Sequence, residues 1–201
     1  IYKSDKGFDL YKDFSKKIIL TNKNIKNFIN KTSTNKLKNK DTDLFLGFFG
    51  YEILNNLIGV KLKNQKSLKF PKGIFYKPET KVKLSNKLNY TPSSSIKPNK
   101  FFKVNLSKTS YENIFNKFKK KIKKGETYQI KICTKYKTKS KFNPLDFFCR
   151  LSKTNLAPEA FMIKDKDYSV ISCSPENLIT KKGRLITTKP IAGTVKKNKG
   201  M

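Results

Sequence analysis

The sequence predicts an α+β fold of mostly antiparallel sheets with flanking helices. The first observation is a pair of hairpin patterns near the end of the chain, one joining residues 161–164 to 168–173 and the other joining 178–180 to 185–188. The second is that helical patterns occur between the strands without regular β-α alternation, which disfavours a doubly wound parallel sheet. The third is that hydrophobic residues make up 36% of the 201 positions, enough for a sizeable core.

The first part of the chain is rich in lysine and asparagine. Residues 1–40 contain one apolar cluster, at 18–20, and we expect surface helix and loop here. The apolar run at 44–49 predicts a buried strand that ends at Gly50. Residues 51–58 then have the pattern of a short amphipathic helix.

Two strands and a linker follow. We expect strands at 73–76 and 81–84, joined by a turn at Pro78. Residues 90–100 contain two prolines and a serine run, so they are the best linker candidate.

The linker divides the chain into two expected parts. Residues 1–100 form a partial N-terminal region that ends in the Pro/Ser-rich linker, and residues 101–201 form the start of a second domain. Residue 1 is Ile, and Met201 follows a stretch rich in lysine and glycine. We therefore expect the chain to be a truncated piece of a longer protein.

The clearest helical pattern follows the linker. Thr109 and Glu112 have the spacing of a capping box, and Gly125 is a natural stop. Between them, apolar residues repeat at helical spacing: Tyr111, Ile114, Phe115, Phe118 and Ile122.

A strand and another helix are expected next. Residues 128–136 alternate between apolar and mostly polar side chains, which predicts a strand with Gln129 on its polar face. Asn143 and Pro144 are good residues for the first positions of a helix that we expect to reach Leu151.

The formal net charge of +32 comes from 46 basic and 14 acidic residues. Only Arg150 and Arg184 are arginine, so 46 − 2 = 44 basic residues are lysine. Nucleic-acid binders rely more on arginine for bidentate contacts. The lysines fit a drift of codons towards A-rich triplets, and a functional surface for polyanions is the alternative. In either case the field favours anionic partners and substrates.

Cysteine usage and hydropathy set the expected compartment. Cys133, Cys149 and Cys173 are far apart, which argues against a disulfide framework, and the absence of histidine excludes an ordinary zinc site. No apolar run approaches the roughly 18 residues that a membrane span needs, and no signal peptide is visible. We expect a reducing, cytoplasmic setting without membrane contact.

Four segments in order resemble the chorismate-binding family, which includes anthranilate, aminodeoxychorismate, isochorismate and salicylate synthases. Residues 125–130 (GETYQI) resemble the family's G-D-x-[FY]-Q-V, and 174–176 (SPE) its A-S-P-E loop. Residues 189–194 (KPIAGT) are similar to R-P-I-A-G-T, and 46–52 (LGFFGYE) more loosely to G-Y-x-x-Y-D. The resemblance implies a partial anthranilate-synthase-type fold, with residues 101–201 forming the start of a truncated chorismate-binding catalytic domain.

The resemblance also implies a chemistry. A nucleophile attacks a chorismate ring carbon as the ring hydroxyl leaves, assisted by Mg²⁺, whose ligands we expect beyond Met201. Gln129 stands where water-adding members have a lysine base, which favours amination because ammonia needs no base to be nucleophilic. Ala192 stands where aminodeoxychorismate synthases often have a covalent lysine, so the closest match is the large subunit of anthranilate synthase. Gly193 and Thr194 would bind the substrate through a backbone N–H and a hydroxyl.

The chain departs from the family pattern in two places. The tryptophan feedback motif N-P-S-P-Y-M-F matches at three positions, Asn155, Pro158 and Phe161, which are the candidate effector-binding residues. The arginine-rich stretch after Thr194 is replaced by lysines with altered spacing. Since the family's metal ligands and much of its pocket come later, we expect residues 1–201 alone to be inactive.

Alternatives stay open. The first hypothesis is conversion of chorismate and ammonia to anthranilate and pyruvate, with a glutamine amidotransferase subunit or domain supplying the ammonia. The runner-up is aminodeoxychorismate synthase, which Tyr128 favours slightly. A non-catalytic relative that acts through binding is a third possibility. A lysine-rich nucleic-acid-binding module is disfavoured, because lysines 119–121 and 123–124 lie on the polar face of the expected helix.

Overall fold

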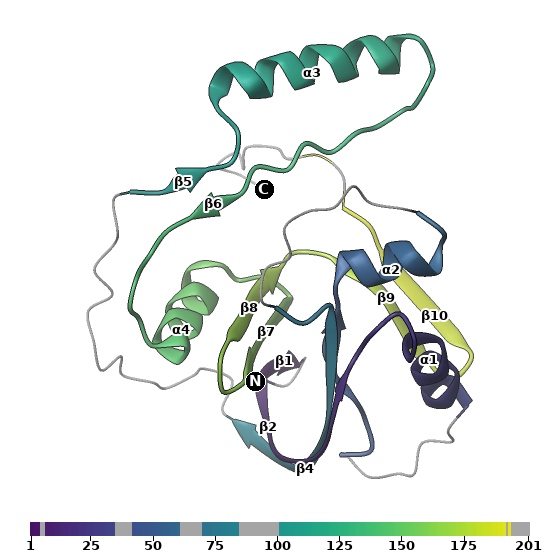
Figure 1. Cartoon of the computed structure of the whole chain (residues 1–201). Coiled ribbons are helices and arrows are strands. Elements are labelled where there is room, and N and C mark those ends of the chain that lie inside the picture. Colours follow the sequence, from purple (N-terminus) through teal and green to yellow (C-terminus); the bar gives the residue numbers. More distant parts are fainter. Residues whose placement is uncertain (5–6, 35–41, 61–69, 85–100, 192, 194–201) are drawn as a thin grey trace, which may run out of the picture. The chain divides into compact units, whose positions relative to one another are not determined.

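The structure is a computed structural model that describes residues 1–4, 7–34, 42–60, 70–84, 101–191 and 193 (Figure 1). The chain divides into two units, which are described separately. The first unit contains residues 1–91 and 148–201, and the second contains residues 92–147. The predicted linker at 90–100 lies outside the described residues, and the predicted division at residue 100 stays a prediction.

A six-stranded antiparallel sheet forms the first unit, with the strand order β3-β4-β2-β1-β7-β8. The antiparallel sheet and its flanking helices confirm the predicted fold class. The strands come from both ends of the sequence: β1 Tyr2–Ser4, β2 Gly7–Ile19, β3 Leu46–Phe49, β4 Gly73–Leu84, β7 Glu159–Lys164 and β8 Ser169–Ser174.

The expectation of surface helix and loop for residues 1–40 is wrong over most of the described part. Residues 7–19 form the 13-residue strand β2, which pairs with β4 along nearly its whole length (Figure 1). Helix α1, Ile25–Thr34, is the part of the prediction that is confirmed. The prediction was wrong because the middle of β2 is exposed and therefore tolerates lysines within a strand. Pairing with the neighbouring strand outweighs the polar composition there.

The predicted turn at Pro78 is also wrong, because β4 runs through this residue as one continuous strand. Pro78 lies opposite Phe14, where the register of β2 shifts by one residue between Phe14 and Lys16. Asp13, directly before this bulge, has a φ of 56°. A bulge tolerates proline because the missing N–H is not needed in the local ladder.

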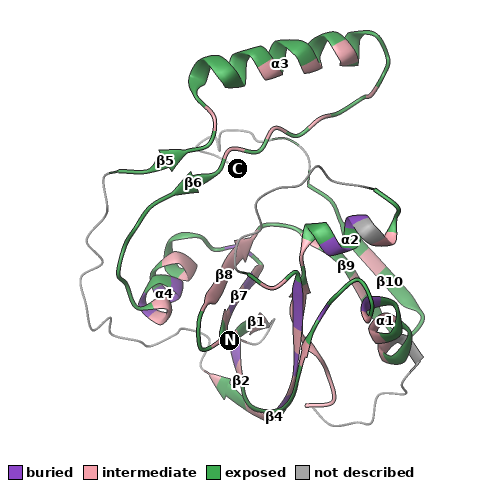
Figure 2. Cartoon of the chain, in the orientation of Figure 1, coloured by how far each residue is buried: buried purple, intermediate pink, exposed green. Residues whose placement is uncertain are grey.

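Helices α1 and α2 (Tyr51–Leu57) cover one face of this sheet, and α2 confirms the helix predicted at 51–58. Their contact with the sheet is the main buried cluster, coloured as buried in Figure 2, in which Leu20, Ile25 and Ile53 are at most 2% exposed. The phenyl ring of Phe28 in α1 lies 4.8 Å from that of Phe75 in β4. Neighbouring residues such as Phe75 and Tyr76 point to opposite faces, so Tyr76 lies on the face away from the helices.

Strand β3 confirms the strand predicted at 44–49 over its last four residues, but the expected burial is wrong, because these residues are half-buried or exposed. A side chain at Gly47 is excluded, since a Cβ there would lie 1.9 Å from the backbone oxygen of Ile74 on β4. Gly50 is equally confined, with a Cβ position 2.3 Å from the backbone oxygen of Lys72. Glycine is therefore required where β3 meets β4 and turns into α2.

The later elements follow the predictions closely. Helix α4 (Pro144–Thr154) begins after Asn143, whose Oδ1 accepts a hydrogen bond from the Leu145 N–H at 2.9 Å. The β7–β8 hairpin is confirmed, as is the second hairpin, formed by β9 (Asn177–Lys182) and β10 (Leu185–Lys189). Gly183 in the turn of the second hairpin has a φ of 59°.

In the second unit the described elements are β5 (Lys103–Val104), helix α3 (Lys108–Lys123) and β6 (Tyr136–Lys137). Helix α3 confirms the predicted helix and ends just before Gly125, which has a φ of 74°. Its cap is not the predicted Thr109. Ser107 caps the helix instead, since its hydroxyl accepts a hydrogen bond from the Ser110 N–H at 3.1 Å.

The strand predicted at 128–136 is wrong over most of its length. Among the described residues, only Tyr136 of this range pairs with another strand, opposite Val104. The remainder carries the alternation of a strand but has no assigned ladder partner in the described part of the chain. Alternation of apolar and polar side chains therefore predicts a segment that could form a strand, but it does not predict whether another strand lies beside that segment to pair with it.

Candidate functional site

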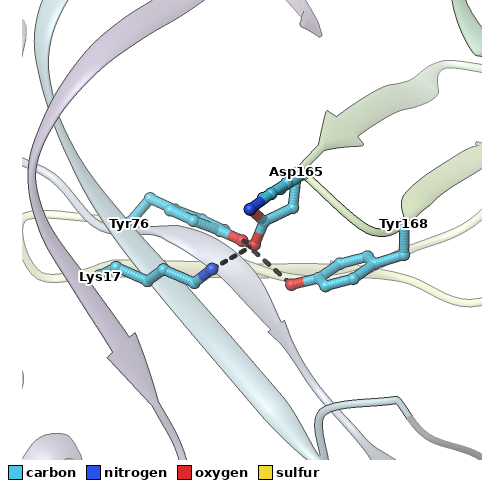
Figure 3. Close-up of polar contacts among 5 residues, drawn as sticks. Lys17, Tyr76, Asp165 and Tyr168 are labelled. Atoms are coloured by element: carbon cyan, nitrogen blue, oxygen red, sulfur yellow. Dashed lines mark hydrogen bonds and ion pairs between the residues drawn. The ribbon is translucent and has the colours of Figure 1, made fainter.

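A polar cluster joins strands β2 and β4 to the turn of the β7–β8 hairpin, on the sheet face that carries Tyr76 (Figure 3). The Asp165 carboxylate, in the hairpin turn, is its centre. Its Oδ2 accepts a hydrogen bond from Lys17 Nζ at 2.6 Å and one from the Tyr76 hydroxyl at 2.5 Å. Its Oδ1 accepts the Lys166 N–H at 2.7 Å.

The two tyrosines of this cluster form an ordered chain. Their hydroxyl oxygens are 3.0 Å apart. Because Tyr76 has one hydroxyl proton and donates it to Asp165, Tyr168 is the donor to Tyr76. Tyr76 belongs to β4 and Lys17 to β2, while Tyr168 lies in the turn just before β8. The carboxylate therefore connects the β2–β4 pair with a hairpin that is not next to that pair in the sheet.

The charges of this Asp165 cluster are fixed near neutral pH. Hydrogen bonds from Lys17 and Tyr76 hold the pKa of Asp165 well below its ordinary range. Burial, together with the bond to Asp165, raises the pKa of Tyr76, and burial raises that of Tyr168. The bond to Asp165 raises the pKa of Lys17. A carboxylate that stays ionised beside hydroxyls that stay protonated is suited to holding structure rather than to transferring protons.

Two further aromatic rings lie beside the tyrosines of the Asp165 cluster. The ring of Phe14 lies 5.2 Å from that of Tyr76, and the ring of Phe70 lies 5.1 Å from that of Tyr168. The sequence analysis missed this cluster and assigned residues 165–167 only to a turn. One signal in the sequence could have pointed to this cluster. Acidic residues are scarce in this chain, 14 in all, and two of them, Asp165 and Asp167, occur in this one turn.

The candidate effector residues lie along one segment between α4 and β7. The Asn155 N–H donates to the Leu151 oxygen at the end of α4, and Pro158 is exposed just before β7. Phe161 is half-buried in β7, opposite Tyr2. Contacts from β1 hold this segment, since Lys3 Nζ donates to the Ala157 oxygen at 2.8 Å.

Glu159 takes the place of the motif's tyrosine in this effector segment. Its carboxylate accepts hydrogen bonds from the Tyr2 hydroxyl at 3.1 Å and from Asn177 Nδ2 at 2.8 Å. The segment is thereby tied to both β1 and β9. These contacts leave the prediction of effector binding by Asn155, Pro158 and Phe161 untested.

Gln129 lies in the extended segment 128–135 of the second unit. Its side chain is exposed, and the alternating residues Lys131, Cys133 and Lys135 are exposed as well. Its backbone oxygen accepts a hydrogen bond from the Thr127 hydroxyl at 3.3 Å. Gln129 therefore faces solvent beside lysines, which is a surface that attracts anions.

The remaining candidates follow β10. Gly193 is described and has a φ of 84°, with open space where a Cβ would lie. Ala192 and Thr194 lie outside the described residues. Gly193 belongs to the first unit and Gln129 to the second.

The ligands of the expected Mg²⁺ were predicted to lie beyond Met201, and that expectation stays a prediction. Magnesium prefers several oxygen ligands in octahedral geometry, and among the described residues no three His, Cys, Asp or Glu side chains gather in one place. The Asp165 carboxylate already accepts hydrogen bonds from Lys17, from Tyr76 and from the Lys166 N–H. Among the described residues, no group of side chains is therefore a candidate for holding the ion.

None of the helices among the described residues has both the length and the hydropathy of a membrane span.

The fold has a clear counterpart among solved structures. It is similar to anthranilate synthase component I from Streptococcus pneumoniae TIGR4, with a TM-score of 0.73 and 15% identity, over 90% of this chain and 53% of that one. The observed sheet is thus the anthranilate-synthase type of sheet that the motifs predicted.

The family follows from a match along the chain. The family model for chorismate binding enzymes matches residues 2–201. The chain therefore belongs to the chorismate-binding enzyme family.

Three relatives illustrate the range within this family. The anthranilate synthase component I-like protein of Synechocystis is 27% identical over 187 residues, 78% of this chain and 38% of that protein. Anthranilate synthase component 1 of Buchnera aphidicola (Rhopalosiphum padi) is 36% identical over 118 residues, 58% of this chain and 23% of that protein. Aminodeoxychorismate synthase component 1 of Bacillus subtilis is 28% identical over 98 residues, which are 49% of this chain and 21% of that protein. The chain thus spans well under half of the length of these relatives.

Proposed function

We propose that this chain is part of the large, aminating subunit of an anthranilate synthase. In the proposed reaction, ammonia attacks a ring carbon of chorismate, the ring hydroxyl leaves as water, and loss of the enolpyruvyl side chain yields anthranilate and pyruvate. Chorismate and ammonia together give anthranilate, pyruvate and water, so the atoms balance. The subunit would act in a cytoplasmic setting, in tryptophan biosynthesis, with a glutamine amidotransferase subunit or domain delivering ammonia.

The observation that carries this proposal is Gln129 within the matching motif. A neutral amide cannot take a proton from water at physiological pH, whereas ammonia attacks without a base. The exposed Gln129 side chain, flanked by the exposed Lys131, presents hydrogen-bonding capacity in a positive field. This is an environment that suits an anionic substrate and an uncharged nucleophile.

Ala192 supports anthranilate as the product. The aminodeoxychorismate branch uses a lysine amine at the matching position as a covalent nucleophile, and a methyl side chain cannot form that bond. Several relatives are anthranilate synthase component 1 proteins, including those of Buchnera and Saccharomyces cerevisiae.

A second candidate is aminodeoxychorismate synthase. The Bacillus subtilis relative and Tyr128, which is 91% exposed in the Gln129 segment, favour it. The two reactions differ in one product, because aminodeoxychorismate formation leaves the enolpyruvyl side chain on the ring and releases no pyruvate.

The test is a product assay with chorismate, ammonium and Mg²⁺. Residues 1–201 are assayed alone and fused to the C-terminal remainder of the Buchnera relative. We expect equal amounts of anthranilate and pyruvate from the fusion and neither from residues 1–201 alone. Gln129→Lys in the fusion should lower anthranilate formation about 10²-fold or more and allow a water adduct of chorismate to form.

The matched control is Asn116→Ala in the same fusion. Asn116 is an exposed amide side chain on α3 of the second unit, outside every segment that carries the family resemblance. Its replacement should leave the rate of anthranilate formation unchanged, which separates the loss of a particular amide from a general effect on this unit.

Three results would contradict the proposal. An amino adduct without pyruvate would assign the aminodeoxychorismate branch. Anthranilate from residues 1–201 alone would disprove the expected inactivity of this piece. An unchanged rate of anthranilate formation in the Gln129→Lys fusion would show that the neutral amide at this position does not favour amination.

A further inference from the structure

A chain of hydrogen bonds runs across the base of the β9–β10 hairpin. The Tyr2 hydroxyl and Asn177 Nδ2 donate to the two carboxylate oxygens of Glu159, at 3.1 Å and 2.8 Å. Asn177 Oδ1 in turn accepts a hydrogen bond from the Thr180 hydroxyl at 3.1 Å. Glu159 is the first residue of β7 and Asn177 the first of β9, and both are half-buried. The starts of these two strands are therefore bound to each other through their side chains.

This Glu159–Asn177 tie fixes the hairpin to the six-stranded sheet. Among the described residues, the hairpin pairs with no strand of that sheet. The loop that joins them is held by Ser174, whose hydroxyl accepts the Glu176 N–H at 3.2 Å and donates to the Glu176 oxygen at 3.0 Å. Glu159 is the register partner of Ser174. The tie therefore closes across the loop and sets the direction in which β9 leaves it.

The tie at the start of β9 reaches the end of β10. Asn177 is the register partner of Lys189, the last residue of β10. The register shifts just before Lys189, where the Thr188 hydroxyl donates to the Leu178 backbone oxygen at 2.8 Å. Such bulges redirect a strand and often lie next to functional sites. Pro190 has a fixed φ and keeps Lys189 extended, so the direction set at Lys189 is passed on to the residues that follow.

The residues that follow include the candidate substrate-binding residues Gly193 and Thr194. Gly193 has a φ of 84°, a conformation that favours glycine and allows the backbone to approach a ligand closely. Residues 177–189 contain four basic side chains and no acidic one: Lys181, Lys182, Arg184 and Lys189. Chorismate carries two carboxylates, so the field of this hairpin favours its approach.

We propose that Glu159 and Asn177 are positioning residues, which hold the β9–β10 hairpin in the orientation that presents Gly193 and Thr194 to chorismate. The inference rests on the proposed function and on substrate binding by these two residues. In this role neither Glu159 nor Asn177 contacts the substrate. The tyrosine of the motif has one oxygen where Glu159 has two, so the tie is a feature of this chain rather than of the motif.

Exchanging the two side-chain chemistries gives a specific test. Asn177→Asp replaces the donor by a second carboxylate, which faces Glu159 with a like charge and without a proton to share. Adding Glu159→Gln to Asn177→Asp restores the tie, because the new amide can donate to the new carboxylate and still accept from the Tyr2 hydroxyl. The single variant should therefore lose the positioning, and the double variant should regain it.

The first readout is the KM for chorismate. The fusion to the C-terminal remainder of the Buchnera relative is assayed by consumption of chorismate, with chorismate and ammonium varied separately. We expect Asn177→Asp to raise the KM for chorismate about tenfold, and the double variant to return it to within about threefold of the native value. The KM for ammonium should change less than about twofold. A loss of folded protein would lower kcat and leave both KM values unchanged, so this pattern is specific for positioning.

The second readout is amide hydrogen exchange of the same fusion without substrate. Amides of residues 185–189 should exchange about tenfold faster in Asn177→Asp, and at close to the native rate in the double variant. Asp165→Asn is the matched control for both readouts. Asp165 directly follows β7, at the end of the strand opposite Glu159, so its replacement weakens the same sheet and leaves the tie in place. Its KM for chorismate should stay within about twofold of the native value.

Four results would overturn the inference: an unchanged KM for chorismate in Asn177→Asp, unchanged exchange of residues 185–189, no recovery in the double variant, or an equal rise in KM for Asp165→Asn. The expected KM pattern without pyruvate would support the positioning role and contradict the proposed function. Anthranilate and pyruvate with an unchanged KM would do the reverse. A fusion that consumes no chorismate would contradict both.

Discussion

Replacing Asp165 by Asn tests whether the cluster at the β7–β8 turn stabilises the sheet. The substitution keeps the shape of the side chain and removes its charge. Tyr76 and Lys17 can still donate hydrogen bonds to the amide oxygen, but the bonds are no longer charge-assisted. The loss therefore reports mainly the charge-assisted part of the bonds from Lys17 and Tyr76, together with the bond from the Lys166 N–H, which the amide nitrogen of Asn cannot accept.

The magnitude follows from the two bonds to Asp165. A hydrogen bond to a charged group contributes about 1.5–3 kcal/mol and a neutral one about 0.5–1.5 kcal/mol, so each bond loses about 1 kcal/mol. The Asp165 side chain is 14% exposed, but that of Lys17 is 46% exposed, and solvent screening reduces the second contribution to about half or less. We expect Asp165→Asn to lower the free energy of unfolding by about 1–2 kcal/mol at pH 7.

The pH dependence has a defined sign. The folded-state pKa of Asp165 is depressed by Lys17 and Tyr76, so its stabilisation is present above the unfolded pKa of about 3.9 and is lost as the pH falls further. The difference between the native sequence and Asp165→Asn should thus shrink between about pH 5 and pH 3. The pKa of Tyr76 is raised, so its contribution is present below about pH 10 and is lost as the pH rises above that.

The assay is pulse proteolysis in urea, which reads the folded fraction in dilute samples. With a slope of about 2 kcal/mol per molar urea, the midpoint should fall by about 0.5–1 M. Asp167→Asn, an exposed change in the same turn, is the matched control and should leave the midpoint unchanged. Equal midpoints for Asp165→Asn and the native sequence at pH 7, or a difference independent of pH from 3 to 7, would refute the reasoning.

Three further predictions concern other parts of the chain. Gly47→Ala should destabilise the first unit by about 2–3 kcal/mol in the same assay, because its Cβ meets the Ile74 oxygen; a smaller midpoint shift than that of Asp165→Asn would contradict the close approach. Ser107→Ala should reduce the helicity of α3 by circular dichroism at a cost of about 1 kcal/mol, and unchanged helicity would rule out this cap. The exposed Cys133 should react with iodoacetamide at least about tenfold faster than the buried Cys149, as read by mass spectrometry, and equal rates would contradict the burial.

The parts of the fold that sequence predicted best are those with strong local signals. The β7–β8 and β9–β10 hairpins and helix α4 have turn or capping residues that act over a few positions, such as Asn143. The long strand β2 was missed because its identity depends on pairing with β4, which is distant in the sequence. Pro78 shows the same limit, since the bulge that accommodates it lies on β2 and not on its own strand.

The sequence predicted some of the candidate site residues and missed others. The motif resemblance located Gln129 and Gly193, but it could not tell that they fall in different units of the chain. The Asp165 cluster was not predictable, since Lys17, Tyr76 and Tyr168 are brought together by three separate elements and no spacing in the sequence relates them. Side-chain networks of this kind become visible once the register of the sheet is known.

Three of the four segments that carry the family resemblance are loosely packed, whereas the fourth, residues 46–52, includes the closely confined Gly47 and Gly50. Residues 125–130, 174–176 and 189–191 are mostly exposed, whereas the buried cluster at Leu20 and Ile53 lies outside all three. Cores accept many apolar combinations of similar volume, so their sequences carry little family information. Segments that bind a substrate or another part of the fold need particular side chains. The exposure of Gln129 within one of these segments therefore fits its proposed contact with the substrate.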